Sequence, residues 1–352
     1  MIFKTYTNKA KYLMLSIALA TSSFMIAQDT KQDTIPKFRI SGTVDAYFRS
    51  NLNAPNVGDN TMAPGSSFAQ LSGFALGMAN IITAYEGEKV GFVADLVFGP
   101  RGTDAIFNSP MYSSTGNVVN QLYMYWNVSE KVTLTMGNFN TFLGYEVISP
   151  AANFNYSTSY LFSYGPFSHT GIKADFALGE DLSAMIGVFN PTDLTEYNPT
   201  GIYAFGAQLG YKGQYVNLIT DSGAYELDYT GGFSLSDHFY LGLNAAVYDN
   251  DGTGFAGVAL YPQLSTSDTF ALGLRGEYFV ESGAYGAIDQ IGNGTEDGSV
   301  FALTLTASAS VGNLILKPEF RIDNASDDSF LNTKFAPQKS LSSFLLAAVY
   351  VF

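Results

Sequence analysis

The sequence predicts one antiparallel β-barrel of about sixteen strands that spans a membrane. Three observations favour this fold class. Strand-like runs with one apolar and one polar face recur along the chain, and the connections between them alternate between short and long. Only 14% of the 352 residues are charged, yet no apolar run of the ~20 residues that a membrane-spanning helix needs follows the amino-terminal segment. Strands that turn every second side chain toward lipid meet all three conditions.

The first 27 residues are expected to form a cleaved signal peptide. They combine lysines with an apolar run that is too short to span a membrane. Cleavage could follow Ala20, where small residues have the expected spacing, or Ala27, which we favour because a polar stretch begins directly after it. Residues 28–37 are expected to be a polar, disordered tail in the periplasm, and residues 38–352 to form the barrel as one domain.

Charge and cysteine content exclude several classes of function. Removal of the signal peptide takes away Lys4, Lys9 and Lys11, which changes the formal net charge from −14 to −17. A chain this acidic is not expected to bind nucleic acid. The absence of cysteine excludes disulfides, thiol catalysis, thiolate metal sites and a lipid anchor on cysteine. No cofactor and no metal site are expected.

The connections give the strand count. Seven short turns and eight other connections produce sixteen strands, with both ends of the chain on one side of the membrane. Each strand and its connection have about twenty residues, enough for the ~9–11 residues that a tilted strand needs. The short turns are expected at 85–89, 127–131, 178–181, 210–214, 235–237, 265–268 and 311–313, and the other connections at about 51–69, 100–117, 140–168, 190–202, 221–224, 249–254, 281–298 and 324–340.

Charged side chains share one face of several predicted strands. In residues 314–323 four ionisable groups alternate with apolar residues, and a dry core would not tolerate such a face, so we expect it to meet water in the lumen. The alternation fails in residues 70–82, which are apolar on both faces, and Pro318 interrupts its strand. The residues expected to line the pore are Arg39, Asp45, Arg49, Asp95, Lys173, Asp175, Arg275, Glu277, Lys317, Glu319, Arg321 and Asp323, and Glu226 and Asp228 also fall on inward faces.

One stretch resembles a known family. GNFNTFLGYE (137–146) leads into NFNYSTSYLFSYGPFSHTGI (153–172), and QLYMYW (121–126) precedes them. These strings resemble the "putative beta-barrel porin" family of OmpL-like proteins found in outer membranes of Bacteroidota, and the resemblance is strongest across residues 118–176. It implies a porin of about sixteen strands in the outer membrane of a Gram-negative bacterium, and it names no solute.

The longest connection, residues 141–168, is the third of the longer set. In general porins the third loop folds into the lumen and narrows it, and by this analogy we expect the same here. Basic wall residues that face an acidic loop would then produce a transverse field. The alternative is a loop packed outside the barrel. The expected constriction residues are Glu146, Asn153, Asn155, Tyr156 and Tyr160, with Tyr164 beside them.

An enzymatic site is not expected. A Ser–His–acid site needs a histidine that a third group orients, and the chain has only His169 and His238. His238 falls in an expected turn, and His169 borders the third loop, where a structural hydrogen bond is the simpler interpretation. The segment DNDGTG (249–254) begins like a calcium-binding loop but lacks the later ligands, so we interpret it as a turn.

The last twelve residues, LSSFLLAAVYVF, are expected to be the closing strand. Apolar residues occupy every second position, and the run ends on an aromatic residue. This ending resembles the closing strand of bacterial outer-membrane barrels, so Tyr350 and Phe352 are expected to be the signal that the barrel-assembly machinery reads. The alternative is a buried last strand of a soluble sandwich.

The residues and the resemblance together favour a passive diffusion channel for small hydrophilic solutes and ions. Barrels of about this strand number leave an aqueous lumen, whereas eight-stranded barrels fill with side chains. Acidic loop residues such as Asp193 and Asp249 would raise the cation concentration at the mouth, which predicts weak cation selectivity. Outer-membrane lipid, lipopolysaccharide and the barrel-assembly machinery are expected partners. The sequence does not decide whether the chain forms a homotrimer. The alternative is a non-conducting surface or adhesin-type barrel, whose sign would be a lumen filled with bulky apolar side chains.

Overall fold

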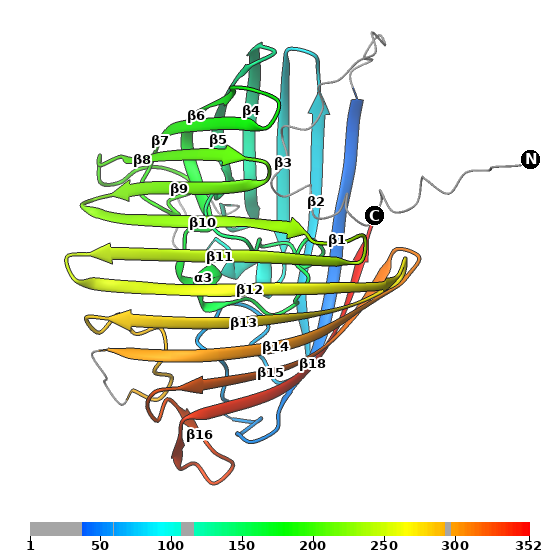
Figure 1. Cartoon of the computed structure of the whole chain (residues 1–352), viewed down its shortest axis with the longest axis vertical. Helices are drawn as coiled ribbons and strands as arrows, with labels where there is room; N and C mark the ends of the chain where they lie inside the picture. Colours follow the sequence, from blue (N-terminus) through cyan, green and yellow to red (C-terminus); the bar gives the residue numbers. More distant parts are fainter. Residues whose placement is uncertain (1–36, 59, 107–115, 293–296) are drawn as a thin grey trace, which may run out of the picture.

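The computed structural model describes residues 37–58, 60–106, 116–292 and 297–352. Within these residues sixteen antiparallel strands form one closed barrel, which confirms the predicted fold class (Figure 1). The strands follow one another around the barrel in sequence order, and the first pairs with the last. The predicted signal peptide and nearly all of the predicted polar tail lie outside the described residues.

The connections contain little regular structure. A two-stranded hairpin, β16–β17, lies in the last long connection and is separate from the barrel. In the part of the chain that the structure describes, no helix has the length and hydrophobicity needed to cross a membrane. The elements are β1 (Lys37–Asn51), β2 (Gly73–Glu86), β3 (Val90–Phe98), α2 (Pro100–Asp104), η1 (Gly116–Val118), β4 (Val119–Ser129), β5 (Val132–Asn140), α3 (Tyr160–Tyr164), β6 (Ser168–Ala177), β7 (Leu182–Phe189), β8 (Ala204–Tyr211), β9 (Gln214–Asp221), β10 (Ala224–Ser234), β11 (Phe239–Asn250), β12 (Thr253–Ser267), β13 (Phe270–Ser282), β14 (Gly298–Val311), β15 (Leu314–Ala325), β16 (Phe330–Leu331), β17 (Pro337–Gln338) and β18 (Ser340–Val351).

Side chains alternate between the two faces of the wall, as the period of an extended strand requires. On β18, Phe344, Leu346 and Tyr350 are exposed, whereas Leu345 and Ala347 between them are buried. The same alternation recurs on the neighbouring strands, and the exposed side chains are largely apolar. The outer face therefore suits lipid, and the buried face points into the barrel.

The last strand closes the barrel against the first. β1 pairs with β18 over nine residue pairs. Beyond that ladder the backbone N–H of Phe352 donates to Gly42 O, and the N–H of Gly42 donates to Phe352 O, both at 3.0 Å. A Cβ at Gly42 would lie 2.1 Å from Asn80 O, so glycine permits the close packing here. Closure leaves no strand edge without a partner in the hydrocarbon.

Two connections are shorter than their neighbours at the same end of the barrel. The β9–β10 turn consists of residues 222–223 and the β11–β12 turn of residues 251–252. Both residues of each turn have positive φ, from 52° at Asp251 to 97° at Gly223, as in a two-residue hairpin. The expected alternation of short and long connections therefore fails at these two places, although the strand count is unaffected.

The irregular places in the sequence pattern are irregular in the barrel as well. The register between β1 and β2 shifts between Val44 and Ala46, and on β2 this bulge interrupts the alternation between Leu76 and Ala79, within the irregular stretch 70–82. Pro318 stays within β15, and the β14–β15 pairing is interrupted beside it without a change of register. Since proline has no N–H to donate, only that local part of the ladder is lost.

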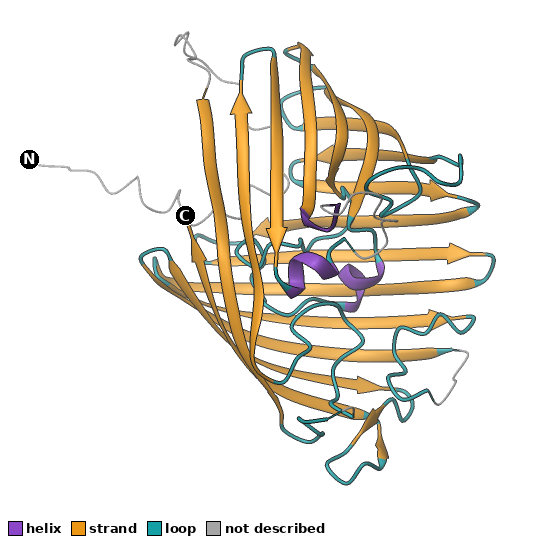
Figure 2. Ribbon diagram, turned by 180° about the vertical axis from the view of Figure 1, so that it is seen from behind, coloured by secondary structure: helices purple, strands orange, loops and turns teal. Residues whose placement is uncertain are grey.

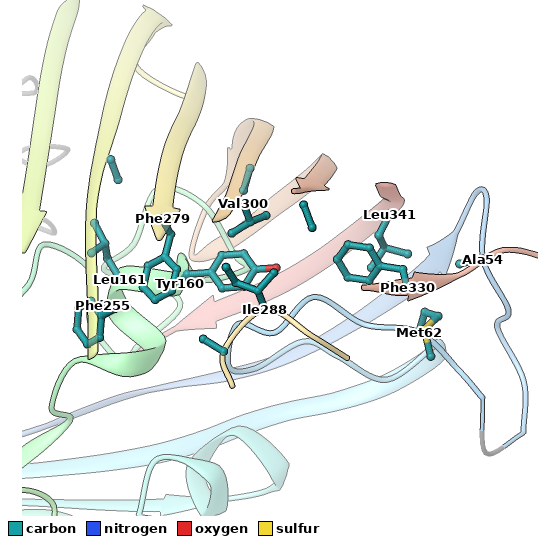
Figure 3. Close-up of a cluster of buried hydrophobic side chains, with 14 of the residues drawn as sticks. Ala54, Met62, Tyr160, Leu161, Phe255, Phe279, Ile288, Val300, Phe330 and Leu341 are labelled. Carbon is teal, nitrogen blue, oxygen red and sulfur yellow. The ribbon is translucent and has the colours of Figure 1, made fainter. Parts of the chain in front are cut away.

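Apolar side chains gather on the inner wall at the end that carries the long connections. In the cluster of Figure 3, Tyr160 of the third long connection packs with Phe255 of β12 and Phe279 of β13. Ile288 and Phe330, from two later connections, belong to the same cluster. The long connections therefore pack against the inner wall as a layer with its own apolar core.

Changing Phe352 tests the role of the closing strand. Phe352→Asp, or deletion of Phe352, should sharply lower the amount of folded, heat-modifiable protein in the outer membrane. The residue continues the pairing of β18 with β1, and it is 47% exposed on the lipid-facing side. Phe335→Asp is the control, because Phe335 is 57% exposed in a connection and lies outside the barrel ladder. Unchanged assembly of the Phe352 variants would remove the assembly role from this residue.

Candidate functional site

The third long connection, residues 141–167, lies inside the barrel. We call it the third loop; it joins β5 to β6 and contains the short helix α3, which Figure 2 shows within the ring of strands. Its contacts with inward-facing side chains of β1, β13 and β15 exclude the alternative of a loop packed outside. The five predicted constriction residues are all buried, with exposures of 4% for Glu146, 7% for Asn153, 2% for Asn155 and 0% for Tyr156 and Tyr160.

Two wall carboxylates accept hydrogen bonds from the loop backbone. Glu319 on β15 accepts from the N–H of Tyr156 at 3.0 Å and from that of the next residue at 3.3 Å. Glu277 on β13 accepts from the N–H of Tyr160 at 3.0 Å and from that of the next residue at 2.8 Å. The last two N–H groups begin helix α3, where no preceding turn supplies a carbonyl. The carboxylates therefore satisfy donors whose burial would otherwise be costly.

Wall cations bind carbonyl groups of the same loop. Lys317 Nζ donates to Pro150 O at 2.7 Å and also to Asn153 O. Arg321 Nη1 donates to Thr158 O at 2.8 Å. Both cations are on β15, on the same face as Glu319, so this one strand holds the loop through its N–H groups and its carbonyl groups alike.

A buried ion pair joins the loop to β13. Arg275 Nη1 lies 2.7 Å from Glu146 Oε1, and the two side chains are 0% and 3% exposed. Arg275 also donates to Ser157 O at 2.6 Å, while Glu146 accepts from the N–H of Ser159 at 2.7 Å. Opposite charges of wall and loop therefore meet in direct contact. Each charge has further hydrogen bonds, which offset the cost of removing it from water.

Arg101 of α2 is a loop anchor that the sequence analysis missed. Its Nε donates to Ile148 O at 2.8 Å and its Nη1 to Tyr156 O at 3.1 Å. The guanidinium carbon lies 4.4 Å from the ring centroid of Phe68 in the first long connection. Arg101 therefore links three connections. It follows Pro100 in a five-residue helix within a connection, and no periodic pattern distinguishes it from a surface arginine.

Asp45 and Gly77 fix the middle of the loop against β1 and β2. The hydroxyl of Tyr156 donates to Asp45 Oδ2, and the N–H of Met78 donates to Asp45 Oδ1 at 3.0 Å. A Cβ at Gly77 would lie 1.6 Å from Asp45 Oδ2 and 2.7 Å from the Tyr156 hydroxyl. Glycine is therefore required for this contact, a role that its position in the sequence did not indicate.

Some predicted wall residues bind one another away from the third loop. Asp95 accepts from the side-chain amides of Asn80 at 3.1 Å and Asn120 at 2.6 Å. Lys173 lies 3.2 Å from Asp175 on β6. These charged groups lie on β3 and β6, which are not neighbours of β15 in the barrel.

The ends of the wall hold two more predicted cations. Arg49 donates to Met62 O at 3.2 Å and to Gln70 O at 3.1 Å, so it anchors the first long connection. Arg39 pairs with Glu86 at the end with the short turns, and its side chain is 55% exposed.

Three further acids lie on inward faces. Asp323 accepts from Arg321 Nη2 at 2.7 Å. Asp228 accepts from the N–H of Gly144 at the start of the third loop, at 3.1 Å. Glu226, on the same strand, is 5% exposed. Most of the predicted wall charges are thus engaged with the loop or with each other, and their contribution to a pore lining stays a prediction.

Neither histidine has the surroundings of a catalytic base. His169 is buried, its Nε2 lies 3.0 Å from Thr141 Oγ1, and its ring packs beside Phe142 and Phe189. His238 lies in the exposed β10–β11 turn. Among the described residues there is no group of three or more His, Cys, Asp or Glu side chains that could hold a metal ion.

Asp193 holds the second end of the third loop. The sequence predicts this residue among the exposed acids of the mouth, but it is only 8% exposed. Its Oδ1 accepts from the N–H groups of Phe167 and Ser168, both at 2.8 Å. Burial raises the pKa of Asp193 to about 7, against the lowering effect of these two hydrogen bonds.

Comparisons with known proteins agree with this architecture. The family model described as "Putative beta-barrel porin-2, OmpL-like" matches residues 37–352. The outer membrane channel DcaP of Acinetobacter baumannii is similar, with 12% identity and a TM-score of 0.55 over 93% of this chain and 100% of that one. OmpF of Salmonella typhi has 11% identity and a TM-score of 0.57 over 90% and 98%. The trimer form of OmpT of Vibrio cholerae has 11% identity and a TM-score of 0.51 over 90% and 99%.

At these identities the likeness to solved structures is a likeness of fold. None of the curated proteins matches the chain in sequence.

Shortening the third loop tests whether it narrows the lumen. Deleting the central part of residues 146–165 while keeping the strand ends should raise single-channel conductance, because the inner face of β13–β15 would then meet water. Glu277→Gln should give a smaller increase, since it removes only the charge that holds α3. Glu86→Gln, at the end with the short turns, is the matched control. Unchanged conductance after the deletion would show that the loop does not set the narrowest cross-section.

The raised pKa of Asp193 predicts a dependence of stability on pH. A folded-state pKa above the unfolded value means that the neutral acid stabilises the fold. This contribution is complete below the ordinary pKa of 3.8 and is lost as the pH rises through about 7. The midpoint of heat modification should therefore be lower at about pH 8 than at about pH 6.

Asp193→Asn should flatten this difference, because an amide cannot ionise. Asp251→Asn, in an exposed turn at the same end of the barrel, should leave it unchanged. A pH dependence that survives in Asp193→Asn would assign the effect to another group.

Proposed function

This chain belongs to the OmpL-like β-barrel porin family, and from that premise we propose that it carries small hydrophilic solutes and ions through its lumen by passive diffusion. The observation that carries the proposal is the closed barrel itself, whose outer face is apolar and whose interior holds polar and charged side chains. Barrels of 16–18 strands are wide enough for an aqueous channel, and this barrel has sixteen strands.

The proposal includes a place in the outer membrane. The porin is an integral outer-membrane barrel, with the chain termini and the short turns in the periplasm and the long connections outside, as in bacterial barrels. Outer-membrane lipid and lipopolysaccharide surround the apolar outer face, and the barrel-assembly machinery inserts the chain. The trimer form of OmpT supports a homotrimer. Removal of residues 1–27 as a signal peptide belongs to the same proposal.

Weak cation selectivity is the finer part of the proposal. The inner-wall charges are mostly bonded to partners, so the charges at the mouth determine the local ion concentration. Among the described residues at the end with the long connections, the acids that are at least partly exposed outnumber the exposed lysines Lys334 and Lys339. These acids are Asp104, Glu196, Asp221, Asp249, Asp251, Asp289, Asp297, Asp327 and Asp328.

A non-conducting barrel is the second candidate, and one observation favours it. Tyr160, Phe255 and Phe279 are buried in an apolar cluster on the inner wall, and such side chains would fill a closed lumen. This cluster covers one part of the wall, whereas polar side chains dominate the inner face of β15. The proposal also excludes an enzyme. It is supported by the porin family and by the packing of His169 between aromatic rings.

Planar-bilayer recording of the refolded mature protein tests these proposals together. We expect steady single-channel conductance and weak cation preference in a dilute KCl gradient. The preference should fade as the Debye length shrinks from about 30 Å at 0.01 M to about 3 Å at 1 M salt. Asp249→Asn with Asp251→Asn should reduce it, and Lys334→Gln should increase it.

Two outcomes would contradict the proposal. Correctly folded protein without conductance would favour the non-conducting barrel. A clear preference for anions would show that inner-wall cations such as Arg49 or Lys317, rather than the mouth, control selectivity.

A further inference from the structure

A cavity of about 90 Å³ lies inside the barrel, between the third loop and the inner faces of β9–β12. Tyr145 lines it from the loop, and Tyr215, Tyr240 and Tyr261 line it from three different strands. Gly213 of the β8–β9 turn also belongs to the lining, so the cavity extends toward the end with the short turns. It is therefore placed where a solute that has passed the loop would arrive.

The aromatic rings of the lining lie over glycines of the wall. A Cβ at Gly232 would lie 2.3 Å from Tyr240 Cζ, and a Cβ at Gly273 would lie 2.2 Å from Phe154 Cε1. Because each ring packs against glycine backbone without a side chain, it lies close to the wall. The part of the ring that does not contact the glycine faces the cavity. The same arrangement holds at two more glycines. A Cβ at Gly242 would lie 2.4 Å from the hydroxyl oxygen of Tyr145, and a Cβ at Gly210 would lie 2.7 Å from Cε1 of Tyr215.

The polar groups of the lining are neutral or already neutralised. Thr230, Asn155 and Gln263 bring hydroxyl and amide groups to the cavity. Glu146 is the one charged residue among the described residues of the lining, and Arg275 binds it at 2.7 Å. The cavity therefore combines aromatic rings with neutral hydrogen-bonding groups and offers no free charge to a solute.

We propose that this cavity binds one ring of a neutral sugar as the sugar crosses the barrel, a proposal that rests on the porin function. A sugar ring has apolar C–H surfaces that pack on aromatic rings, and hydroxyl groups that both donate and accept hydrogen bonds. A charged solute would lose water here without gaining a partner of opposite charge. The volume corresponds to roughly six water molecules, which suits a single ring rather than a whole oligosaccharide.

Maltose is the probe for the first experiment. The mature protein is refolded in a detergent without a sugar head group and recorded in planar bilayers with KCl. Maltose should reversibly reduce the ion current in a concentration-dependent and saturable way. Glucuronate, whose ring carries a carboxylate, should reduce the current less at the same concentration.

Tyrosine variants locate the site. Tyr240→Leu and Tyr215→Leu should each weaken the effect of maltose about 2- to 10-fold, which corresponds to the loss of one aromatic contact. Tyr278→Leu is the matched control, because Tyr278 is 49% exposed on the outer face of β13 and should change nothing. Equal weakening by all three substitutions would assign the effect to altered folding and overturn the proposed site.

Saturation-transfer NMR of the refolded protein with maltose gives a readout that needs no current. If the protein conducts ions but maltose neither reduces the current nor shows transfer, the sugar site is wrong and the porin function stands. If the protein conducts no ions but shows transfer that Tyr240→Leu abolishes, the site stands and the proposed transport function fails. Transfer that is equal in the wild type and in Tyr240→Leu would place maltose elsewhere.

Discussion

A segment of irregular backbone can lie inside this barrel only because the wall satisfies its hydrogen bonds. A buried amide group without a partner costs several kcal/mol on apolar reference scales, and the third loop brings a series of such groups into the interior. β15 meets this requirement with inward side chains that alternate in sign, Lys317, Glu319, Arg321 and Asp323. The cations donate hydrogen bonds to carbonyl groups of the loop, and Glu319 accepts hydrogen bonds from its N–H groups. The strand therefore binds the loop, and the charges of its two cations and two anions sum to zero.

The other face of the same strand lies toward lipid. Because successive side chains point to opposite faces, β15 can bind the loop with one set of residues and contact lipid with the other. Phe320 is exposed between two buried ions, and Pro318 occupies another outward position, where its missing N–H costs only part of the β14 ladder. The closed ring completes this division, because a strand edge in hydrocarbon would leave backbone groups without partners. The contacts of Gly42 and Phe352 therefore belong to the same constraint as the anchoring of the loop: every backbone group in the membrane needs a partner inside the protein.

The alternation of residue types was enough to predict the barrel and most of the inward faces, because these depend on local periodicity, and the number of connections predicted the strand count. It could not show that Glu319 binds the loop, since its partner is the backbone of a residue 163 positions away. Arg101 was missed for a related reason, because its role arises from contacts between connections, which have no period. Gly77 was missed because the side chains that leave no room for a Cβ there, Asp45 and Tyr156, are distant in sequence. The two-residue turns at 222–223 and 251–252 lie within the connections predicted at 221–224 and 249–254, and the Asp-Gly pair of the second is typical of such a hairpin.

The position of the loop divides the interior unequally. Beside β13–β15 the lumen is occupied by the loop and its ion pairs. At the end with the long connections an apolar cluster fills a further part of the lumen. The cavity of about 90 Å³ lies next to this part, between the loop and β9–β12, where tyrosines pack over glycines of the wall. In the proposed transport, a solute that enters the cavity meets neutral groups and the ion-paired Glu146, while exposed acids such as Asp251 act on ions at the mouth through long-range fields. Ion preference and solute preference would then depend on different residues, so a change in one need not alter the other.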